Sequence, residues 1–482
     1  MPSLPKSPRL RRILLAYTVN QLGTWFAYVA LMLSVYDHTH SALAVAGLLV
    51  AGRLLPALLT PTLVAAVEMS KRRGGLSRLY MLEAVVAVAM AALLWHFWLP
   101  GLLVLVAIDG TAALTAGALL RATAARVAVE EMVPSTEILA AAGDGENGIG
   151  RGTPAEPGRA DPNSSPRLAD PNSSGPVVAA PGETGESAEE VAQREANAAL
   201  NVAFTASVTL GPAVSGVIVA ASGSPTALLI DAVSFMVCGA LLMNLQVHAS
   251  ADAGSTSVRS RLLAAWGYLQ TAPALRGLLA TEALAIVFFA SVEPVEVLFV
   301  KSTLNAGDRG FGFLTAAWGV GMVLGSLVFA RAVHRPLRPM LTWGTLAVGL
   351  AYIGFSLSPT LAVACGAAVV GGMGNGVQWA ALISSVQHMS PRELLGRLMG
   401  TVEGIGALCP AIGFVLGGVL AQLTSPRTAM LWIGVAAALC TGLFLRVTRK
   451  DLVQAAVSVP AGMPAELASE MAGDMQAASE PR

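Results

Sequence analysis

Apolar residues run along the chain in blocks of about twenty or more, separated by short polar, glycine- or proline-containing breaks. A bilayer core about 30 Å thick requires about 20 apolar residues per helix. Because unpaired backbone groups cannot face lipid, blocks of this length predict α-helices. Twelve blocks qualify: 13–35, 42–66, 78–99, 101–123, 197–221, 226–246, 275–300, 311–333, 340–357, 360–386, 398–423 and 427–447. The pattern predicts an all-α polytopic membrane protein with twelve transmembrane helices.

The distribution of basic residues supports this number of crossings. If the connections alternate between two sides, 26 of the 30 Lys+Arg residues lie on the side of the N-terminus. Three lie on the other side, Lys301, Arg309 and Arg427, and Arg53 lies in mid-membrane. Because cytoplasmic loops carry the excess of Lys and Arg, we expect cytoplasmic N- and C-termini. Arginine outnumbers lysine 26 to 4 and alanine is abundant, as in proteins from GC-rich bacterial genomes, so we expect a bacterial inner (plasma) membrane protein.

Composition divides the chain further. Residues 143–196 are rich in Gly, Pro, Ser and acids, with ten acidic residues against four arginines, and predict a disordered acidic cytoplasmic insertion. We therefore expect helices one to four in 1–142, helices five and six in 197–247, a central cytoplasmic loop in 248–274, a C-terminal bundle in 275–447 and a disordered cytoplasmic tail in 448–482. A docking role for the insertion is the alternative to a spacer.

The two halves repeat one another weakly. The segment Glu131 to Leu139 is similar to His388 to Leu395, and Leu210-Gly-Pro-Ala213 is similar to Leu408-Cys-Pro-Ala411. The spacing from the first motif to the second is longer in the N-terminal half by about the length of the insertion. Duplicated six-helix halves occur in many secondary transporters, in which the substrate binds between them near mid-bilayer. We expect two pseudo-symmetric six-helix bundles.

Ionisable residues within the apolar blocks are candidates for function, because a charge at a helix centre costs about 2.5–3.5 kcal/mol on insertion scales. Arg53 and Asp109 lie at depths that differ by only a few residues, so we hypothesise that they pair; a structural brace is the alternative. The other intramembrane acids are Glu83, Asp231, Glu282, Glu293, Glu296 and Glu403.

The seventh block contains three acids on one broad helix face, Glu282, Glu293 and Glu296, and Pro294 frees a backbone carbonyl beside two of them. Carboxyl groups in a low-dielectric site can exchange protons near neutral pH. We therefore regard these three and Asp109 as proton-coupling candidates, with Glu282 favoured for its depth. In the alternative, Glu293 and Glu296 are solvated at the outer mouth and pair with Lys301.

Several segments, in this order, resemble the major facilitator superfamily, and within it the drug-efflux and siderophore-export branch of macrolide exporter-like and enterobactin exporter-like permeases. The segments are Gln21 to Trp25, His40 to Val45, Arg53 to Pro56, Pro61 to Arg73, Leu210 to Gly216, Asp231 to Phe235, Gly312 to Gly325 and Ser390 to Arg397. The resemblance covers the chain from Arg9 to Arg446 except the insertion. It implies proton-coupled antiport of a small amphipathic compound, such as a drug, a siderophore or a secondary metabolite, by alternating access.

The resemblance also implies positions for the substrate and the gate. The substrate-cavity candidates are Gln21, Trp25, Tyr28, Phe288, Phe289, Asn375, Gln378 and Trp379, for each of which core packing or a place at the lipid interface is the alternative. The cytoplasmic gate candidates are Glu68, Arg72, Arg73, Arg397 and Glu403. The gate segment lacks the family's glycine and first arginine, and Thr24 stands where this branch often has an acid.

Composition excludes several other classes. The chain is 54% hydrophobic and 12% charged with no net charge, which argues against a nucleic-acid partner. Its four cysteines lack CxxC spacing, and there is no Walker motif and no catalytic cluster in the helices, so we expect no metal, no cofactor and no enzymatic activity. The expected partners are a small-molecule substrate, protons and the lipid bilayer. An uptake permease and a transport-inactive membrane sensor or assembly protein remain the alternatives.

Overall fold

The computed structural model describes residues 8–69, 75–132, 188–243, 270, 272–332, 335–389 and 395–447. The described residues form twelve long α-helices and one short π-helix, η2. In chain order these are α1 (Pro8–Thr39), α2 (Ala42–Met69), α3 (Gly75–Trp95), α4 (Leu99–Met132), α6 (Ala188–Ser222), α7 (Ser224–Leu242), α9 (Pro273–Leu298), η2 (Phe299–Thr303), α10 (Gly307–Arg331), α11 (Leu337–Leu357), α12 (Leu361–Met389), α13 (Leu395–Leu423) and α14 (Pro426–Val447). One helix stands at each of the twelve apolar blocks, which confirms the expected all-helical, polytopic fold.

Ten of these helices are long and apolar enough to cross a membrane. In α2, the apolar stretch is shorter and covers Ala42–Leu54. The remaining helix is α1, in which the polar side chains Asn20, Gln21 and Thr24 reduce the mean hydropathy. Polar residues in a membrane helix face protein rather than lipid, and Asn20 is buried accordingly.

The helix α6 begins at Ala188, earlier than the expected start of the fifth block at 197. The expectation of disorder throughout 143–196 is therefore wrong for residues 188–196. Their sequence, AEEVAQREA, consists largely of strong helix formers, and acids near a helix N-terminus favour the helix dipole. The rest of the expected insertion and the tail lie outside the described residues.

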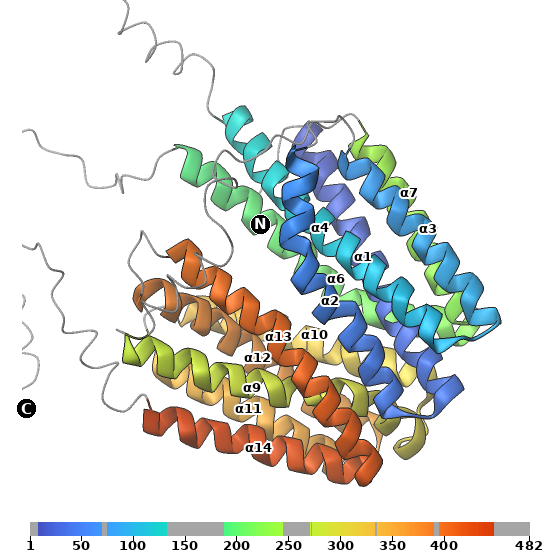
Figure 1. Cartoon of the computed structure of the whole chain (residues 1–482). Coiled ribbons are helices and arrows are strands. Elements are labelled where there is room, and N and C mark those ends of the chain that lie inside the picture. Colours follow the sequence, from blue (N-terminus) through green and yellow to red (C-terminus); the bar gives the residue numbers. More distant parts are fainter. Residues whose placement is uncertain are drawn as a thin grey trace, which may run out of the picture.

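The helices form two bundles with the same internal contacts. In the first, α1 packs on α6 and α7, α2 packs on α4, and α3 packs on α4 and α7. The second repeats every one of these pairs: α9 packs on α13 and α14, α10 packs on α12, and α11 packs on α12 and α14. Figure 1 shows the first bundle, blue through green, beside the second, yellow through red. The two halves therefore share one arrangement, as the sequence repeats predict.

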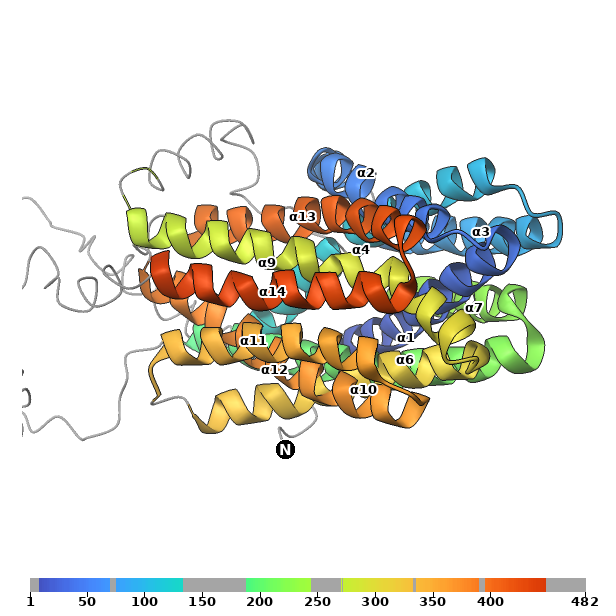
Figure 2. The same cartoon turned by 90° about the horizontal axis from the view of Figure 1, so that it is seen from below.

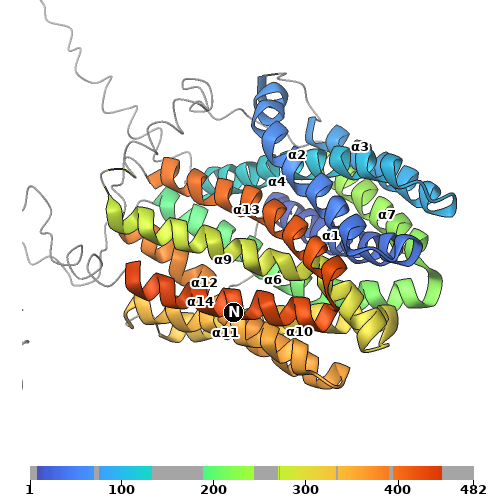
Figure 3. The same ribbon diagram turned by 60° about the horizontal axis from the view of Figure 1, so that its bottom comes forward.

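Two helix pairs make most of the contacts between the bundles, α2 with α13 and α6 with α10. Figure 2 and Figure 3 show α13 running between α9 and α2. On the other side, α6 and α10 approach closely because both carry glycine at the crossing: a Cβ added to Gly216 would lie 2.9 Å from Gly312 Cα. These pairs also occupy matching places in the two halves, which gives the molecule its pseudo-two-fold axis.

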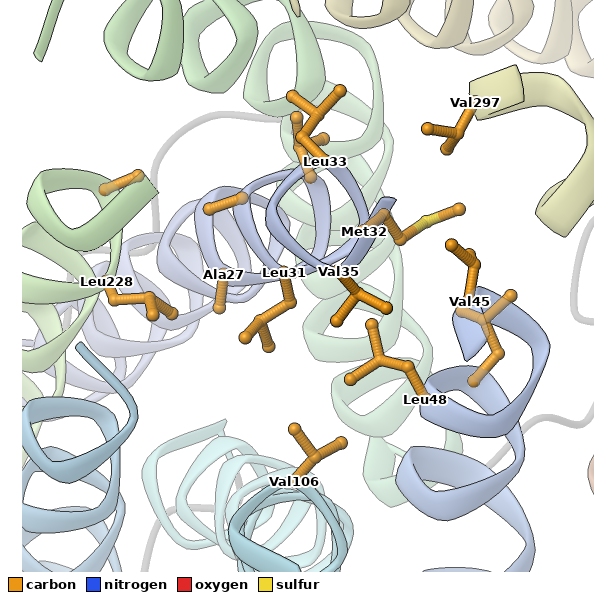
Figure 4. Close-up of a cluster of buried hydrophobic side chains, with 14 of the residues drawn as sticks. Ala27, Leu31, Met32, Leu33, Val35, Val45, Leu48, Val106, Leu228 and Val297 are labelled. Carbon is orange, nitrogen blue, oxygen red and sulfur yellow. The ribbon is translucent and has the colours of Figure 1, made fainter. Parts of the chain in front are cut away.

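Much of the apolar core surrounds α1. Val29, Leu33 and Val35 of this helix are completely buried. Figure 4 shows the α1 side chains surrounded by Val45 and Leu48 of α2, Val106 of α4, Leu228 of α7 and Val297 of α9. The last contact reaches the other bundle, so the core is continuous across the interface at this level.

Candidate functional site

A hydrogen bond joins the two bundles between α1 and α9. The Tyr28 hydroxyl of α1 donates to Glu293 Oε2 of α9 over 2.7 Å. The Trp25 ring supports Tyr28 from the preceding turn, edge to face at a centroid distance of 5.4 Å. Glu293 directly precedes Pro294, which is buried inside α9. The contact therefore brings together two residues that the sequence placed in separate groups, a cavity candidate and a proton-coupling candidate.

Arg53 of α2 belongs to the same site. Of the charged groups that act on its guanidinium, Glu293 acts most strongly. The guanidinium carbon lies 5.7 Å from the centroid of the Phe414 ring on α13, in the range of a cation–π contact. Arg53 therefore extends from the first bundle toward two helices of the second.

The expected Arg53–Asp109 pair does not form: no ion pair joins these two described residues, and Asp109 Oδ1 is buried without a hydrogen-bond partner. The two helices do touch at this depth. A Cβ on Gly110 would lie 2.6 Å from the Gly52 carbonyl oxygen. The two charges nevertheless have different neighbours, since Glu293 acts on Arg53 whereas Asp109 acts on Glu83. The sequence therefore predicted correctly that Arg53 and Asp109 lie at similar depths in the bundle, but the two side chains do not meet.

Aromatic rings line the α9 side of the site. Tyr352 of α11 stacks on Trp318 of α10 at 5.6 Å and meets Phe289 edge to face at 6.2 Å. Its hydroxyl donates to the Phe289 carbonyl oxygen over 3.3 Å. Glu296, one turn after Glu293, is the charged group that acts most strongly on Tyr352. The sequence did not predict that Trp318 and Tyr352 belong to the site, because a single aromatic residue in an apolar block looks the same whether it packs in the core or lines a site.

Glu282 does not share the site of Glu293 and Glu296. It is buried inside the second bundle, where its carboxylate accepts a hydrogen bond from the Gln378 side-chain amide of α12. Both residues belong to the same bundle, so this contact does not cross the interface. Gln378, one of the expected cavity residues, is thus buried against Glu282, and its place in a cavity stays a prediction.

The remaining candidates are less informative. Gln21, Phe288 and Asn375 are half-buried, and Trp379 is 45% exposed. Arg72 and Arg73 of the expected gate lie outside the described residues, and the side chains of Glu68, Arg397 and Glu403 are not described. Their expected contacts therefore stay predictions.

The bundles are held together at the end where residues 40–41, 96–98, 223, 304–306, 358–360 and 424–425 connect the helices, which we call the short-connection end. Here Lys301 of η2 pairs with Asp37 of α1 in the other bundle. It also pairs with Asp308 of α10 at 2.6 Å. A second contact across the interface runs from Gln422 Nε2 to Ser41 Oγ over 3.0 Å. The alternative in which Lys301 neutralises Glu293 or Glu296 is thus not formed.

The three polar contacts between bundles described above lie toward the short-connection end. On α1 they reach from Tyr28 to Asp37, and on α9 and η2 from Glu293 to Lys301. At the opposite end, Figure 1 shows the start of α6 and the end of α4 well apart from the starts of α9 and α13. The molecule is therefore closed at one end and spread at the other.

Comparison with known proteins gives the same fold. Residues 278–461 match the family model of the Major Facilitator Superfamily. No curated protein sequence matches the chain. Among solved structures, a bacterial homologue of the iron transporter ferroportin in its inward-facing state has a TM-score of 0.63 at 13% identity, over 93% of this chain and 100% of that one.

Two other solved structures are similar over the same extent. A bacterial homologue of the human lysosomal transporter Spinster, inward-facing and unoccupied, gives a TM-score of 0.62 at 12% identity, with 93% and 99% coverage. The nucleoside transporter NupG gives 0.59 at 11% identity, with 92% and 99% coverage. At these identities the likeness concerns the fold, which is that of a polytopic membrane transporter with two six-helix bundles.

Proposed function

We propose that the chain is a secondary active transporter that exports a small amphipathic compound in exchange for protons by alternating access. The observation that carries the proposal is the Tyr28–Glu293 hydrogen bond, which joins the two bundles beside Arg53. Charged groups placed inside a membrane protein are costly and are retained where they serve transport. Here they lie on the interface that has to move when one bundle rocks against the other.

The charge distribution supports an orientation for this state. The short-connection end carries Lys301, Arg309 and Arg427, the three basic residues on the sparsely charged side, so we assign it to the outside by the positive-inside rule. Closure of this end by Lys301–Asp37 and Gln422–Ser41 then corresponds to an inward-facing state. Two of the similar solved structures are described as inward-facing as well.

The contacts suggest how proton binding and movement are coupled. In this state the Glu293 carboxylate accepts a hydrogen bond from the Tyr28 hydroxyl of the opposite bundle and attracts the Arg53 guanidinium of the same bundle as Tyr28. If the outer end opens, the Tyr28 hydroxyl moves away and the Glu293 carboxyl loses its hydrogen-bond donor. A proton bound to this carboxyl would remove the attraction to Arg53 that helps to hold the outer end closed. Glu296, one turn further along α9, is the second carboxyl to which we assign proton coupling.

Glu282 has a different role in this account. Depth along the helix favoured it as the proton site, but its partner Gln378 belongs to the same bundle and moves with it. A contact that is equally present in both conformations cannot shift their equilibrium. We therefore assign coupling to Glu293 and Glu296, and stability of the second bundle to Glu282.

The chemistry of the site favours an amphipathic substrate with a cationic group. Glu293 acts on the Arg53 guanidinium and on Glu296, and both carboxyl groups act on Tyr352, whose ring packs with those of Phe289 and Trp318. Aromatic faces attract organic cations, and they also cover the apolar part of such a compound. Arg53 is exposed in this state, so an acidic group on the substrate could also reach it.

The experiment is a proteoliposome assay with the purified chain and a pH-sensitive dye. A panel of lipophilic cations, macrolides and siderophores is added in the presence of an imposed pH gradient. We expect at least one compound to dissipate the gradient, and Glu293→Gln to abolish this while Glu282→Gln retains it. Equal activity of Glu293→Gln and the wild type would contradict the coupling scheme, and lack of dissipation by every compound would contradict exchange.

A further inference from the structure

The first bundle buries a second group of carboxyls away from the interface. Glu83 of α3 and Asp231 of α7 are completely or almost completely buried, with exposures of 0% and 1%. Asp109 of α4 is the third member, and Asp109 and Asp231 are the charged groups that act on Glu83. None of these residues takes part in the Tyr28–Glu293 site.

Close packing between α1, α3 and α7 holds the buried carboxyls in place. Tyr80 of α3 stacks on Phe235 of α7 at 6.4 Å, one turn from both Glu83 and Asp231. On the α1 side, Gly23 leaves room for Asp231 and Ser234, because a Cβ at this glycine would collide with both side chains. Ser234 donates to Asp231 Oδ1 over 3.2 Å. The space between α1, α3 and α7 is therefore built around the Asp231 carboxyl.

The group contains more hydrogen-bonding capacity than the described residues use. Both carboxyl oxygens of Glu83 are buried without a partner, and so is Asp231 Oδ2. Two uncharged side chains of the same bundle are in the same condition, the Tyr80 hydroxyl, on which Glu83 acts, and Asn20 Oδ1. Tyr80 is 0% and Asn20 is 6% exposed. An unsatisfied buried polar group costs about 1–3 kcal/mol, so this many together point to something that binds there.

The charges around the three carboxyls indicate that the group that binds among them is a cation. The groups that act on the three carboxyls are the carboxyls themselves and Ser234, with no Lys, Arg or His among the described residues. The other titratable groups around them are Tyr17 on α1, Tyr80 on α3 and Cys238 on α7. Burying three uncompensated negative charges would cost far more than the fold can supply.

A proton fits better than a metal ion. In the part of the chain that the structure describes, no group of three or more His, Cys, Asp or Glu side chains is arranged to hold a metal. Protons need no coordination shell, and a carboxyl that takes one becomes both donor and acceptor, which would satisfy the Tyr80 and Asn20 oxygens as well.

We propose that Glu83, Asp109 and Asp231 form a second proton-binding site, enclosed in the first bundle and independent of the interface site. Asp109 is the residue through which protons enter and leave, since it is only half-buried, whereas Glu83 and Asp231 are closed off. The site holds its protons in the inward-facing state, and the buried pair exchanges them through Asp109. This proposal does not depend on what the chain transports.

Infrared spectroscopy of the purified chain in nanodiscs at neutral pH tests the proposal without any substrate. We expect the wild type to show the C=O band of protonated carboxyls, and Glu83→Gln and Asp231→Asn each to lose part of it. The matched control is Gly366→Ala, which removes no carboxyl group, has nothing near the added Cβ and should leave the band unchanged.

Loss of carboxylate bands in Glu83→Gln and Asp231→Asn would overturn the proposal. If these variants do not fold, the wild type still decides, because absence of a protonated-carboxyl band at neutral pH contradicts the site. In Asp109→Asn, we expect hydrogen–deuterium exchange of the remaining protonated carboxyls to slow; unchanged exchange would refute entry through Asp109. None of these outcomes depends on transport, so failure here and failure of the proposed exchange are distinguishable.

Discussion

Asp37→Asn tests how the short-connection end is held closed. Lys301 has two acidic partners, but only Asp37 belongs to the opposite bundle, so only this pair should break when the end opens. The Asp37 side chain is 42% exposed and that of Lys301 is 17% exposed. For a pair this accessible, solvent screening leaves about 0.2–1 kcal/mol. Since about 1.4 kcal/mol is tenfold in an equilibrium, we expect the open-to-closed ratio to rise by roughly 1.4- to 5-fold.

The assay is a pulsed electron paramagnetic resonance measurement of the distance between spin labels at Ser222 and Asn305, after replacement of the four native cysteines. Both positions are exposed at the short-connection end and belong to different bundles. The matched control is Asp308→Asn, which removes a partner of Lys301 within its own bundle. We expect this control to leave the distance distribution nearly unchanged. An equal shift in both variants, or no shift in Asp37→Asn, would refute the reasoning.

Three further predictions concern single contacts. Tyr28→Phe removes the hydroxyl donor of the hydrogen bond between bundles, so the same distance measurement should show opening increased by about tenfold or more, from the 1.5–3 kcal/mol of a charge-assisted bond; an unchanged distribution would contradict it. Gly417→Val places a side chain against the Ser291 backbone and should cost about 1–3 kcal/mol in thermal unfolding, whereas Gly366→Ala, with nothing near its Cβ, should not destabilise. Gln378→Leu should destabilise by about 1–3 kcal/mol by leaving Glu282 without its donor, and adding Glu282→Leu should recover most of the loss; additive losses would refute the pairing.

The twelve helices could be predicted from the sequence because lipid imposes a minimum length on each apolar block. The start of α6 could not, since residues 188–196 are polar and continue the helix beyond the lipid-facing block. Hydrophobicity reports where a helix is buried in apolar surroundings, and it does not mark where a helix continues beyond them. The repeat of the two halves was visible in sequence and reappears in their matching helix contacts.

The candidate site was predictable only in part. Sequence gives the depth of a residue along a helix but not the direction in which it points, and this is why Arg53 was assigned to Asp109 rather than to the Glu293 side. The same limit applies to Glu282, which lies on the same helix as Glu293 but contacts only its own bundle. The partners of Lys301 depend on how the bundles meet, and no local pattern encodes that.

Reversible tethering of the two bundles tests alternating access most directly. Ser41 and Gln422 touch across the interface at the short-connection end. Cysteines placed at both positions, in a chain without the native cysteines, can be joined by a short thiol-cleavable bifunctional reagent. We predict that transport in proteoliposomes stops when the tether forms and returns when a reductant cleaves it. Undiminished transport by the fully tethered protein would contradict the account.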